Sequence, residues 1–191
     1  MATQYMHWRS VIPMRKFGLD LLLCGLVAVG IACNWGCGRA PNDIGTDADK
    51  RRQIDERYAS FKQAFPDVHD ISIEECTELA ESQPLVIVDV RPERERDVSM
   101  IPGAISQNWF EEHRCEYRDR LVVTYCTIGA RSGKYAVTLQ QQGFEVANLR
   151  GSILAWAHAG RPLIDKDGPT KRVHIYSAEW NLLPGDYQAV W

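Results

Sequence analysis

The stretch LVVTYCTIGARSG, residues 121–133, passes from an apolar segment into a cysteine, a glycine-containing turn, an arginine and a serine. A continuous apolar, β-branched run is typical of a strand that is covered on both faces of a parallel sheet. The segment after it, residues 132–143, has apolar residues on one helical face and ends at a glycine. The stretch therefore predicts a strand, a tight turn that begins at Cys126, and a helix.

The neighbouring sequence repeats this alternation of strands and helices. LVIVDV (85–90) and FEVANLRG (144–151) are predicted strands, and SILAWAHAG (152–160) is a predicted short helix. In ISIEECTELAE a short strand precedes a helix that Ser72 caps, because Glu75 completes a capping box. The alternation predicts an α/β fold with a mostly parallel central sheet and helices on both faces.

Ligands of parallel sheets bind outside the carboxyl ends of the strands, where Cys126 and Asp89 are both expected. The turn TIGAR leads into a helix whose first amides lack partners and whose positive dipole end faces the cysteine. A thiolate is stabilised there, so we expect the pKa of Cys126 to lie below that of a free cysteine. Gly129 lets the turn close and Arg131 adds a cation. These features favour a nucleophile over a small buried hydrophobic residue, the alternative for a lone cysteine.

Other candidate residues lack such surroundings. Cys76 lies in a predicted helix and Cys115 in EEHRCEYRD, and we expect neither to be reactive. No CxxC pair is present and the histidines have no metal-ligand spacing, so no metal site is predicted. The net charge is −3 and the basic residues are scattered, which argues against a nucleic-acid partner. Four of the five histidines, His69, His113, His158 and His174, are isolated residues beyond the first 37 positions.

The first 37 residues have the pattern of a targeting segment. Basic residues precede an apolar run, residues 17–33, and a polar stretch follows it. The pattern is compatible with a cleaved signal peptide and with a membrane anchor, and GIAC is similar to a bacterial lipobox, which would make Cys33 a lipidation site. Because positive charge before the run stays in the cytoplasm, we expect the folded part in the bacterial periplasm or cell envelope, membrane-tethered or secreted.

The remaining chain divides into four predicted parts. A flexible linker is rich in Gly, Pro, Asn and Asp, and a helical lead-in carries apolar residues at helical spacing up to Pro66. An α/β domain follows, and then a C-terminal extension that packs on it and whose Tyr176, Trp180 and Trp191 are expected over a sheet face or edge. In this order the parts are 38–50, 51–69, 70–165 and 166–191.

The motifs of residues 70–163 resemble a rhodanese homology domain. They are contained in VIVDVRPERERDVSMIPGAI and VVTYCTIGARSGKYAVTLQQQGFEVANLRGSILAWAHAGRPL. Ser99 and Met100 depart from the Gly-His that is frequent before the Ile-Pro-Gly-Ala turn. The family's Asp-Val-Arg strand end, Ile-Pro-Gly-Ala turn, active-site loop and Gly-Gly-hydrophobic-Trp segment correspond to residues 89–91, 101–104, 126–131 and 151–156, with Ser152 in place of a glycine.

The resemblance implies a sulfurtransferase without a separate cofactor. Cys126 would accept a sulfane sulfur from thiosulfate or a persulfide as a covalent persulfide and pass it to a thiol or cyanide. The position after the cysteine carries no cation, unlike that of many thiosulfate-preferring members, so both small donors stay open. The implied residues are Cys126 and Arg131 for catalysis, Thr127, Ile128, Gly129, Ala130 and Ser132 for substrate binding, and Asp89 and Arg91 for structural support.

Two alternative functions stay open. A phosphatase or arsenate reductase of the related loop type has five residues between cysteine and arginine, whereas this chain has the four residues from Thr127 to Ala130. The shorter loop favours a single sulfur atom over a phosphate with three equatorial oxygens. A noncatalytic rhodanese-like binding module is the second alternative, and the presence of Cys126 argues against it.

Overall fold

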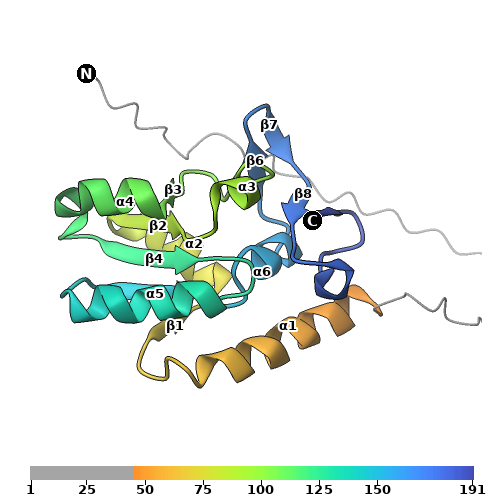
Figure 1. Ribbon diagram of the computed structural model, residues 1–191, viewed down its shortest axis with the longest axis horizontal. Helices are drawn as coiled ribbons and strands as arrows, with labels where there is room; N and C mark the ends of the chain where they lie inside the picture. The colour runs from red at the N-terminus through yellow and green to blue at the C-terminus, as the bar shows by residue number, and fades with distance from the viewer. Residues whose placement is uncertain (1–44) are drawn as a thin grey trace, which may run out of the picture. The chain divides into compact units, whose positions relative to one another are not determined.

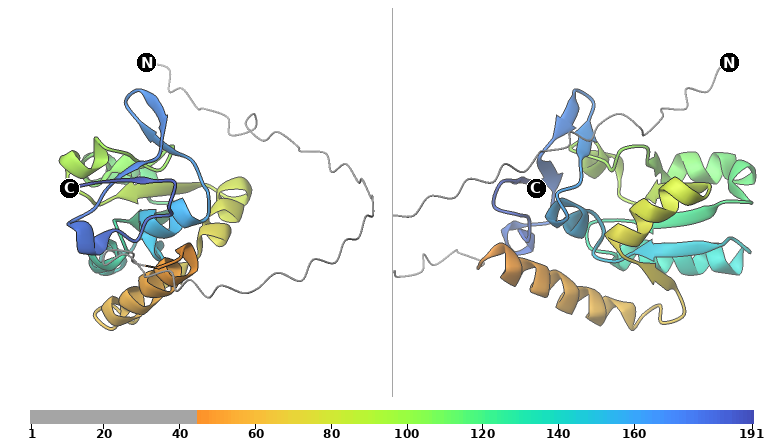
Figure 2. Two further views of the ribbon diagram at one scale, coloured as in Figure 1. Left: turned by 90° about the vertical axis from the view of Figure 1, so that its right-hand side faces the viewer. Right: turned by 180° about the vertical axis from the view of Figure 1, so that it is seen from behind.

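The computed structural model describes residues 45–191, which are built around one parallel β-sheet (Figures 1 and 2). Its strands lie in the order β1-β5-β4-β2-β3, and every pair is parallel. This confirms the predicted α/β class with a parallel central sheet. The strands are β1 His69–Ile71, β2 Leu85–Asp89, β3 Ile105–Ser106, β4 Leu121–Tyr125 and β5 Val146–Leu149.

Helices cover both faces of the sheet, as the alternation of elements predicted. Leu121, Val123 and Tyr125 of β4 join a core cluster with residues of α2 and α6, whereas Val122 joins a second cluster with residues of α4 and α5. Each fully buried aliphatic side chain of this kind contributes about 1.5–3 kcal/mol to folding. The helices are α2 Ile73–Ser82, α3 Glu93–Arg96, α4 Gln107–His113, the 3-10 turn η2 Arg114–Tyr117, α5 Ala130–Gln141 and α6 Ser152–His158.

The capping box predicted at the start of α2 is present. Ser72 Oγ accepts a hydrogen bond from Glu75 N at 3.1 Å, and Glu75 Oε2 accepts one from Ser72 N at 2.7 Å. These bonds satisfy amides that have no partner within the helix. They fix the point at which the chain leaves β1 and turns into α2.

The first helix, α1 (Asp47–Lys62), begins inside the range 38–50 that was expected to be a flexible linker. The reason is a second capping box, in which Thr46 Oγ1 accepts from Asp49 N and Asp49 Oδ2 accepts from Thr46 N. Ile54 and Tyr58 are buried as the periodicity predicted. The helix packs against α5 and α6, so the lead-in belongs to the folded unit.

The C-terminal extension lies beyond the carboxyl ends of the strands, toward which the β4 arrow points in Figure 1. Tyr176 lies over the Arg131 guanidinium, and Trp180 stacks on Phe61 of α1. The extension was expected to place these aromatic residues over a sheet face or edge; Trp180 packs against the core cluster that includes β4, whereas Trp191 is 66% exposed. The domain ends with β6 Leu163–Asp165, and the extension contains β7 Gly168–Thr170, β8 Arg172–His174, η3 Ala178–Trp180 and β9 Gln188–Val190.

The predicted targeting segment, residues 1–37, and the lipidation candidate Cys33 lie outside the described residues. Within residues 45–191, no helix combines the length and the apolar character that crossing a membrane requires.

Candidate active site

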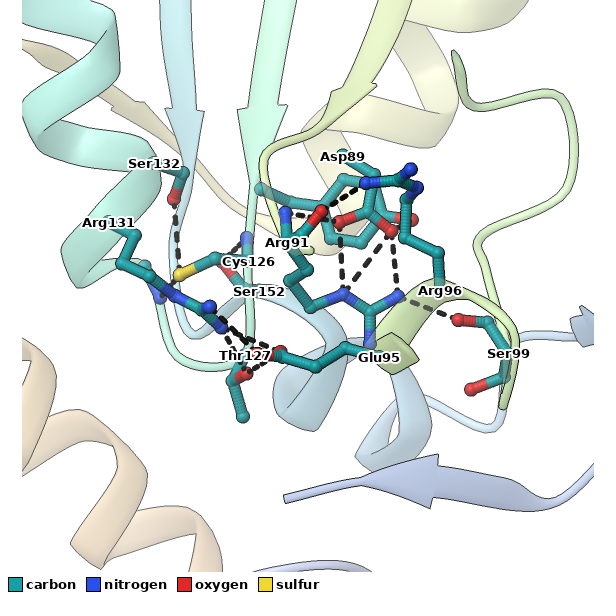
Figure 3. Close-up of polar contacts among 12 residues, drawn as sticks. Asp89, Arg91, Glu95, Arg96, Ser99, Cys126, Thr127, Arg131, Ser132 and Ser152 are labelled. Atoms are coloured by element: carbon teal, nitrogen blue, oxygen red, sulfur yellow. Dashed lines mark hydrogen bonds and ion pairs between the residues drawn. The ribbon is translucent and has the colours of Figure 1, made fainter. Parts of the chain in front are cut away.

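Cys126 follows β4 directly, at the carboxyl end of the sheet and before the first turn of α5 (Figure 3). Gly129 N donates to its Sγ at 3.1 Å, and Ser132 Oγ lies 3.6 Å from the same sulfur. The side chain is 1% exposed. The predicted loop therefore surrounds the sulfur with donors that come from its own backbone and from the start of the helix.

These donors stabilise the thiolate form of Cys126. Burial alone would raise its pKa, but the Ser132 amide, the Arg131 charge, the Ser132 hydroxyl and the Gly129 amide together lower the pKa below 9.0. Cys76 shows the opposite behaviour, since burial without such donors raises its pKa to about 11. The environment thus makes Cys126, and not the buried cysteine in α2, the candidate nucleophile.

Gly129 makes the turn possible. Its φ of 109° lies in the left-handed region, which a residue with a Cβ rarely adopts. In this conformation its N–H faces Cys126 Sγ while its carbonyl accepts the helical bond from Gly133 N at 3.0 Å. The glycine therefore joins the sulfur site to the first turn of α5.

Arg131 is paired with a carboxylate that the sequence motifs did not single out. Its Nη1 and Nη2 atoms donate to Glu95 Oε1 and Oε2 at 2.8 and 2.7 Å, and Nη2 also donates to Thr127 Oγ1 at 3.0 Å (Figure 3). The Glu95 side chain is 1% exposed and that of Arg131 is 32% exposed. The predicted cation lies beside the sulfur, but Glu95 compensates its charge.

The expected loop residues play different parts. Thr127 is buried and its hydroxyl lies between Glu95 and Arg131. Ile128 is 4% exposed and its side chain belongs to the hydrophobic core, so only its backbone can face a substrate. Ala130 is the first residue of α5, and Ser132 contacts the sulfur.

Asp89 and Arg91 form a buried ion pair behind the loop. Arg91 Nε and Nη2 donate to the Asp89 carboxylate at 2.9 and 2.7 Å, and Tyr125 OH donates to Asp89 Oδ2 at 2.5 Å. Arg91 Nη2 also donates to Ser99 O at 2.6 Å. In Figure 3 this cluster lies beside the Glu95 and Arg131 pair, and no dashed line joins Asp89 or Arg91 to Cys126. Its contacts hold the end of β2 against β4 and the following turn.

Ser152 occupies a glycine position of the expected motif and keeps the glycine-like backbone, with a φ of 49°. Its Oγ accepts from Cys126 N at 3.1 Å and donates to Leu149 O at 3.1 Å. The serine at this position therefore supplies a hydroxyl that holds the backbone of Cys126. These bonds offset the conformational cost of a non-glycine residue in the left-handed region.

An open depression of about 490 Å³ adjoins the arginines of the two ion pairs, Arg91 and Arg131. Arg131, Arg96 and Gln107 contribute polar side chains to its wall. Its remaining lining comes from the segment after β2 and from the start of α4, so it lies at the carboxyl edge of the sheet. Among residues 45–191, His, Cys, Asp and Glu side chains form no group of three that could hold a metal ion.

Sequence reasoning missed two residues of this region, Glu95 and Tyr125. The local signal for Glu95 was weak, because it stands among the alternating charges of RPERERD. Tyr125 was read only as part of an apolar strand. Only their burial in the structure distinguishes the two residues from their sequence neighbours, since Glu95 is 1% and Tyr125 0% exposed.

Comparison with known proteins indicates the family of this chain. The family model of the rhodanese-like domain matches residues 72–159. A sulfurtransferase from Allochromatium vinosum is 38% identical over 109 residues, which are 53% of this chain and 99% of that protein. The chain belongs to the rhodanese-like domain family. The residues matched by the family model include the loop from Cys126 to Arg131 and both predicted support residues, Asp89 and Arg91.

Other proteins that are similar to this chain are longer or more distant. A tRNA uridine(34) hydroxylase from Staphylococcus aureus strain Newman is 35% identical over 118 residues, and the matched part is 56% of this chain but only 35% of that protein. The crystal structure of a rhodanese-like domain protein from Staphylococcus aureus has 27% identity and a TM-score of 0.45, covering 52% of this chain and 99% of that chain. The match to the hydroxylase thus spans about a third of that protein's length.

Proposed function

We propose that this rhodanese-like protein is a sulfurtransferase in which Cys126 accepts a sulfane sulfur and passes it to a thiophilic acceptor. The observation that carries the proposal is the set of donors around Cys126 Sγ, with Gly129 N at 3.1 Å and Ser132 Oγ at 3.6 Å. Its relative from Allochromatium vinosum, 38% identical, carries the name sulfurtransferase. Both observations support a nucleophilic thiolate at a family active-site loop.

The chemistry consists of two displacements at sulfur. The Cys126 thiolate attacks the outer sulfur of the donor, an Sγ–S bond forms, and the donor's S–S bond breaks with the electron pair leaving on sulfite or on a thiolate. An acceptor thiolate or cyanide then attacks the outer sulfur of the Cys126 persulfide. The Sγ–S bond breaks, and the products are the Cys126 thiolate and a new persulfide or thiocyanate. The two steps balance without an external oxidant or reductant.

The loop donors serve the anionic states of this cycle. A terminal persulfide sulfur carries negative charge, as the initial thiolate does, and preorganised backbone donors stabilise such charge with little reorganisation. The Gly129 and Ser132 amides are fixed by the turn and by α5. They would therefore favour both the resting thiolate and the loaded persulfide.

The pairing of Arg131 with Glu95 bears on the choice of donor. A compensated guanidinium attracts a dianion such as thiosulfate less strongly than an unpaired one would. It also leaves less positive charge for a phosphate, which adds to the short loop in disfavouring the phosphatase alternative. We therefore favour a low-molecular-weight persulfide over thiosulfate as donor, with a thiol as acceptor.

Mass spectrometry of the intact protein after incubation with thiosulfate or with glutathione persulfide tests the proposal. We expect a gain of one sulfur atom that maps to Cys126, is removed by cyanide or dithiothreitol, and forms more readily from the persulfide. Efficient aryl-phosphate hydrolysis with no sulfur gain at Cys126 would contradict it. In that case the phosphatase alternative would explain the site better.

For location, we propose that the protein acts outside the cytoplasm, attached to the membrane or secreted. The support is the basic and apolar pattern of residues 1–37. Fractionation of expressing bacteria tests this, with membrane or periplasmic recovery expected. Recovery of the unprocessed full chain in the cytoplasm would contradict it.

A further inference from the structure

Tyr58 of α1 reaches the catalytic loop from outside the residues that the family model matches. Its side chain is 3% exposed. A Cβ added at Gly129 would lie 2.5 Å from Tyr58 Cε2, so the ring and the loop backbone are closely packed. The catalytic loop is therefore in contact with a helix that precedes the matched domain.

A chain of hydrogen bonds accompanies this contact. Tyr58 OH donates to Asp70 Oδ1 at 2.6 Å, and Asn148 Nδ2 donates to Tyr58 OH at 2.9 Å and to Gly129 O at 3.1 Å. Because a backbone carbonyl only accepts, the amide nitrogen of Asn148 must be the atom that faces Gly129. Asn148 is 0% exposed, so water does not compete for these bonds.

We propose that Tyr58 and Asn148 are positioning residues that hold Gly129 with its N–H directed at Cys126 Sγ. Gly129 is held from two sides, since its N–H donates to the sulfur and its carbonyl accepts from Asn148 and from Gly133 N. Because glycine has wide conformational freedom, contacts from outside the loop are needed to keep Gly129 at this single φ of 109°. The inference rests on the proposed function, because it gives the role of a donor to the Cys126 thiolate.

The charged groups around Tyr58 keep its hydroxyl in the donor state. Asp70 accepts from it, Lys62 Nζ lies 3.1 Å from Asp70, and Arg150 is the other nearby charge. Burial and Asp70 raise the pKa of Tyr58 well above its ordinary value, so the hydroxyl stays protonated at neutral pH. Its oxygen is then free of negative charge and accepts from Asn148.

A different set of charges faces Cys126. Arg131 of α5 favours its thiolate, and Glu95 of α3 pairs with Arg131. Tyr176 of the C-terminal extension lies over Arg131. A substitution of Tyr58 leaves all three in place. A change in the pKa of Cys126 would therefore report on the Gly129 donor.

The Tyr58→Phe variant keeps the ring and removes only the hydroxyl. The readout is the pH dependence of Cys126 alkylation by iodoacetamide in the full chain, followed by mass spectrometry of the Cys126 peptide. We expect the apparent pKa of Cys126 to rise by about 0.5 to 1, which is a roughly 3- to 10-fold smaller thiolate fraction below that pKa. Asn148→Ala should raise the pKa of Cys126 at least as much.

Tyr135→Phe is the matched control. Tyr135 lies on α5, is partly buried, and its hydroxyl also donates to a carboxylate, that of Glu111. This bond is directed toward α4 and away from the loop, so we expect the alkylation profile of Cys126 to stay unchanged. Unfolding midpoints measured on the same samples show whether the two variants lose similar stability.

The double variant Tyr58→Phe/Asn148→Ala should raise the pKa of Cys126 no further than Asn148→Ala alone, because both act through one chain of bonds. An unchanged pKa in Tyr58→Phe, or an equal rise in Tyr135→Phe, would overturn the inference. Sulfur gain is measured separately on the unsubstituted protein. If sulfur gain were absent while Tyr58→Phe still raised the pKa, the proposed function would fail and the positioning role would stand.

Discussion

Arg131 and Glu95 form a bidentate ion pair that joins the candidate active-site loop to α3, with N–O distances of 2.8 and 2.7 Å. The Glu95 side chain is 1% exposed and that of Arg131 is 32% exposed, so Glu95 depends on its partner for charge compensation more than Arg131 does. Arg131 retains access to water, whereas Glu95 has little access to it. The pair therefore couples the electrostatics of the sulfur site to the stability of the fold.

Glu95→Gln should improve the capture of an anionic donor. The substitution removes the charge that compensates Arg131, and an interaction of unit charges near a protein surface is worth on the order of 1 kcal/mol or more. We expect the KM for thiosulfate to fall roughly 3- to 10-fold at low salt, with a smaller effect at high salt. Steady-state kinetics at two ionic strengths measures this.

Glu93→Gln is a suitable control for that experiment, since Glu93 is exposed on the same short helix. It removes one negative charge without breaking the ion pair. Because Glu93 lines the depression but is not paired with Arg131, we expect a smaller fall in KM than in Glu95→Gln. A KM that rose in Glu95→Gln, or that fell equally in both variants, would show that Glu95 does not restrain Arg131.

The ion pair should also make stability fall in acid. Burial raises the pKa of Glu95, but the hydrogen bonds and charge of Arg131 outweigh this and hold the pKa below 4.5. The unfolded chain therefore binds the proton more readily. The stabilisation from Glu95 is complete above about pH 4.5, near its pKa in the unfolded chain. It is lost as the pH falls through the lower pKa of Glu95 in the folded protein.

Urea unfolding between about pH 3 and 6 measures this contribution. The slope of the unfolding free energy against pH should be shallower in Glu95→Gln than in the unsubstituted protein. Other carboxylates with lowered pKa values, such as Asp186, leave a residual slope in both proteins. Identical slopes would indicate that Arg131 does not depress the pKa of Glu95.

Cys126→Ser should abolish sulfur transfer to cyanide, because serine is not ionised at neutral pH and cannot carry the sulfur. Cys76→Ser and Cys115→Ser should retain activity, since neither has donors like those at Cys126. Thiocyanate formation measures all three. Loss of activity in Cys115→Ser with a normal fold would point to a second thiol in the transfer.

The parts of the fold that follow from local chemistry could be read from the sequence. The β-branched runs predicted strands β2 and β4, and the Ser72 and Glu75 pair predicted the start of α2. The Cys126 turn was predictable for the same reason, because its glycine, helix start and arginine lie within a few residues of one another.

Contacts between distant segments could not be read in this way. Glu95 and Arg131 are separated by 36 positions, and Asn148 and Tyr58 by 90. Nothing local distinguishes Glu95 from Glu93, and only the packing of α3 against the loop decides which carboxylate is buried. The place of Tyr176 over Arg131 likewise depends on how the whole extension returns to the strand ends.

Asp89→Ala should destabilise the protein strongly. Asp89 and Arg91 are both 0% exposed in their side chains, so the substitution leaves a buried guanidinium without its carboxylate. Breaking such a pair costs about 3–5 kcal/mol. Chemical denaturation measures the loss, and activity per folded molecule should be largely retained. A stable Asp89→Ala protein without turnover would indicate a direct catalytic role.

Arg131→Ala and the double variant Arg131→Ala/Glu95→Gln separate the two functions of the ion pair. Arg131→Ala leaves the buried Glu95 charge without its partner, and we expect a loss of about 2–4 kcal/mol in unfolding free energy, discounted for the partial exposure of Arg131. In the double variant the buried charge is absent, so part of this stability should return.

The apparent pKa of Cys126 should respond to these substitutions differently from the stability. Both proteins lack the cation beside Cys126, so the apparent pKa of Cys126 should be raised in both, and somewhat more in Arg131→Ala, where the unpaired Glu95 charge remains. Denaturant unfolding and alkylation profiles measured on the same samples test this. If Glu95→Gln restored the pKa of Cys126 together with the stability, then Glu95 and not Arg131 would control the thiolate.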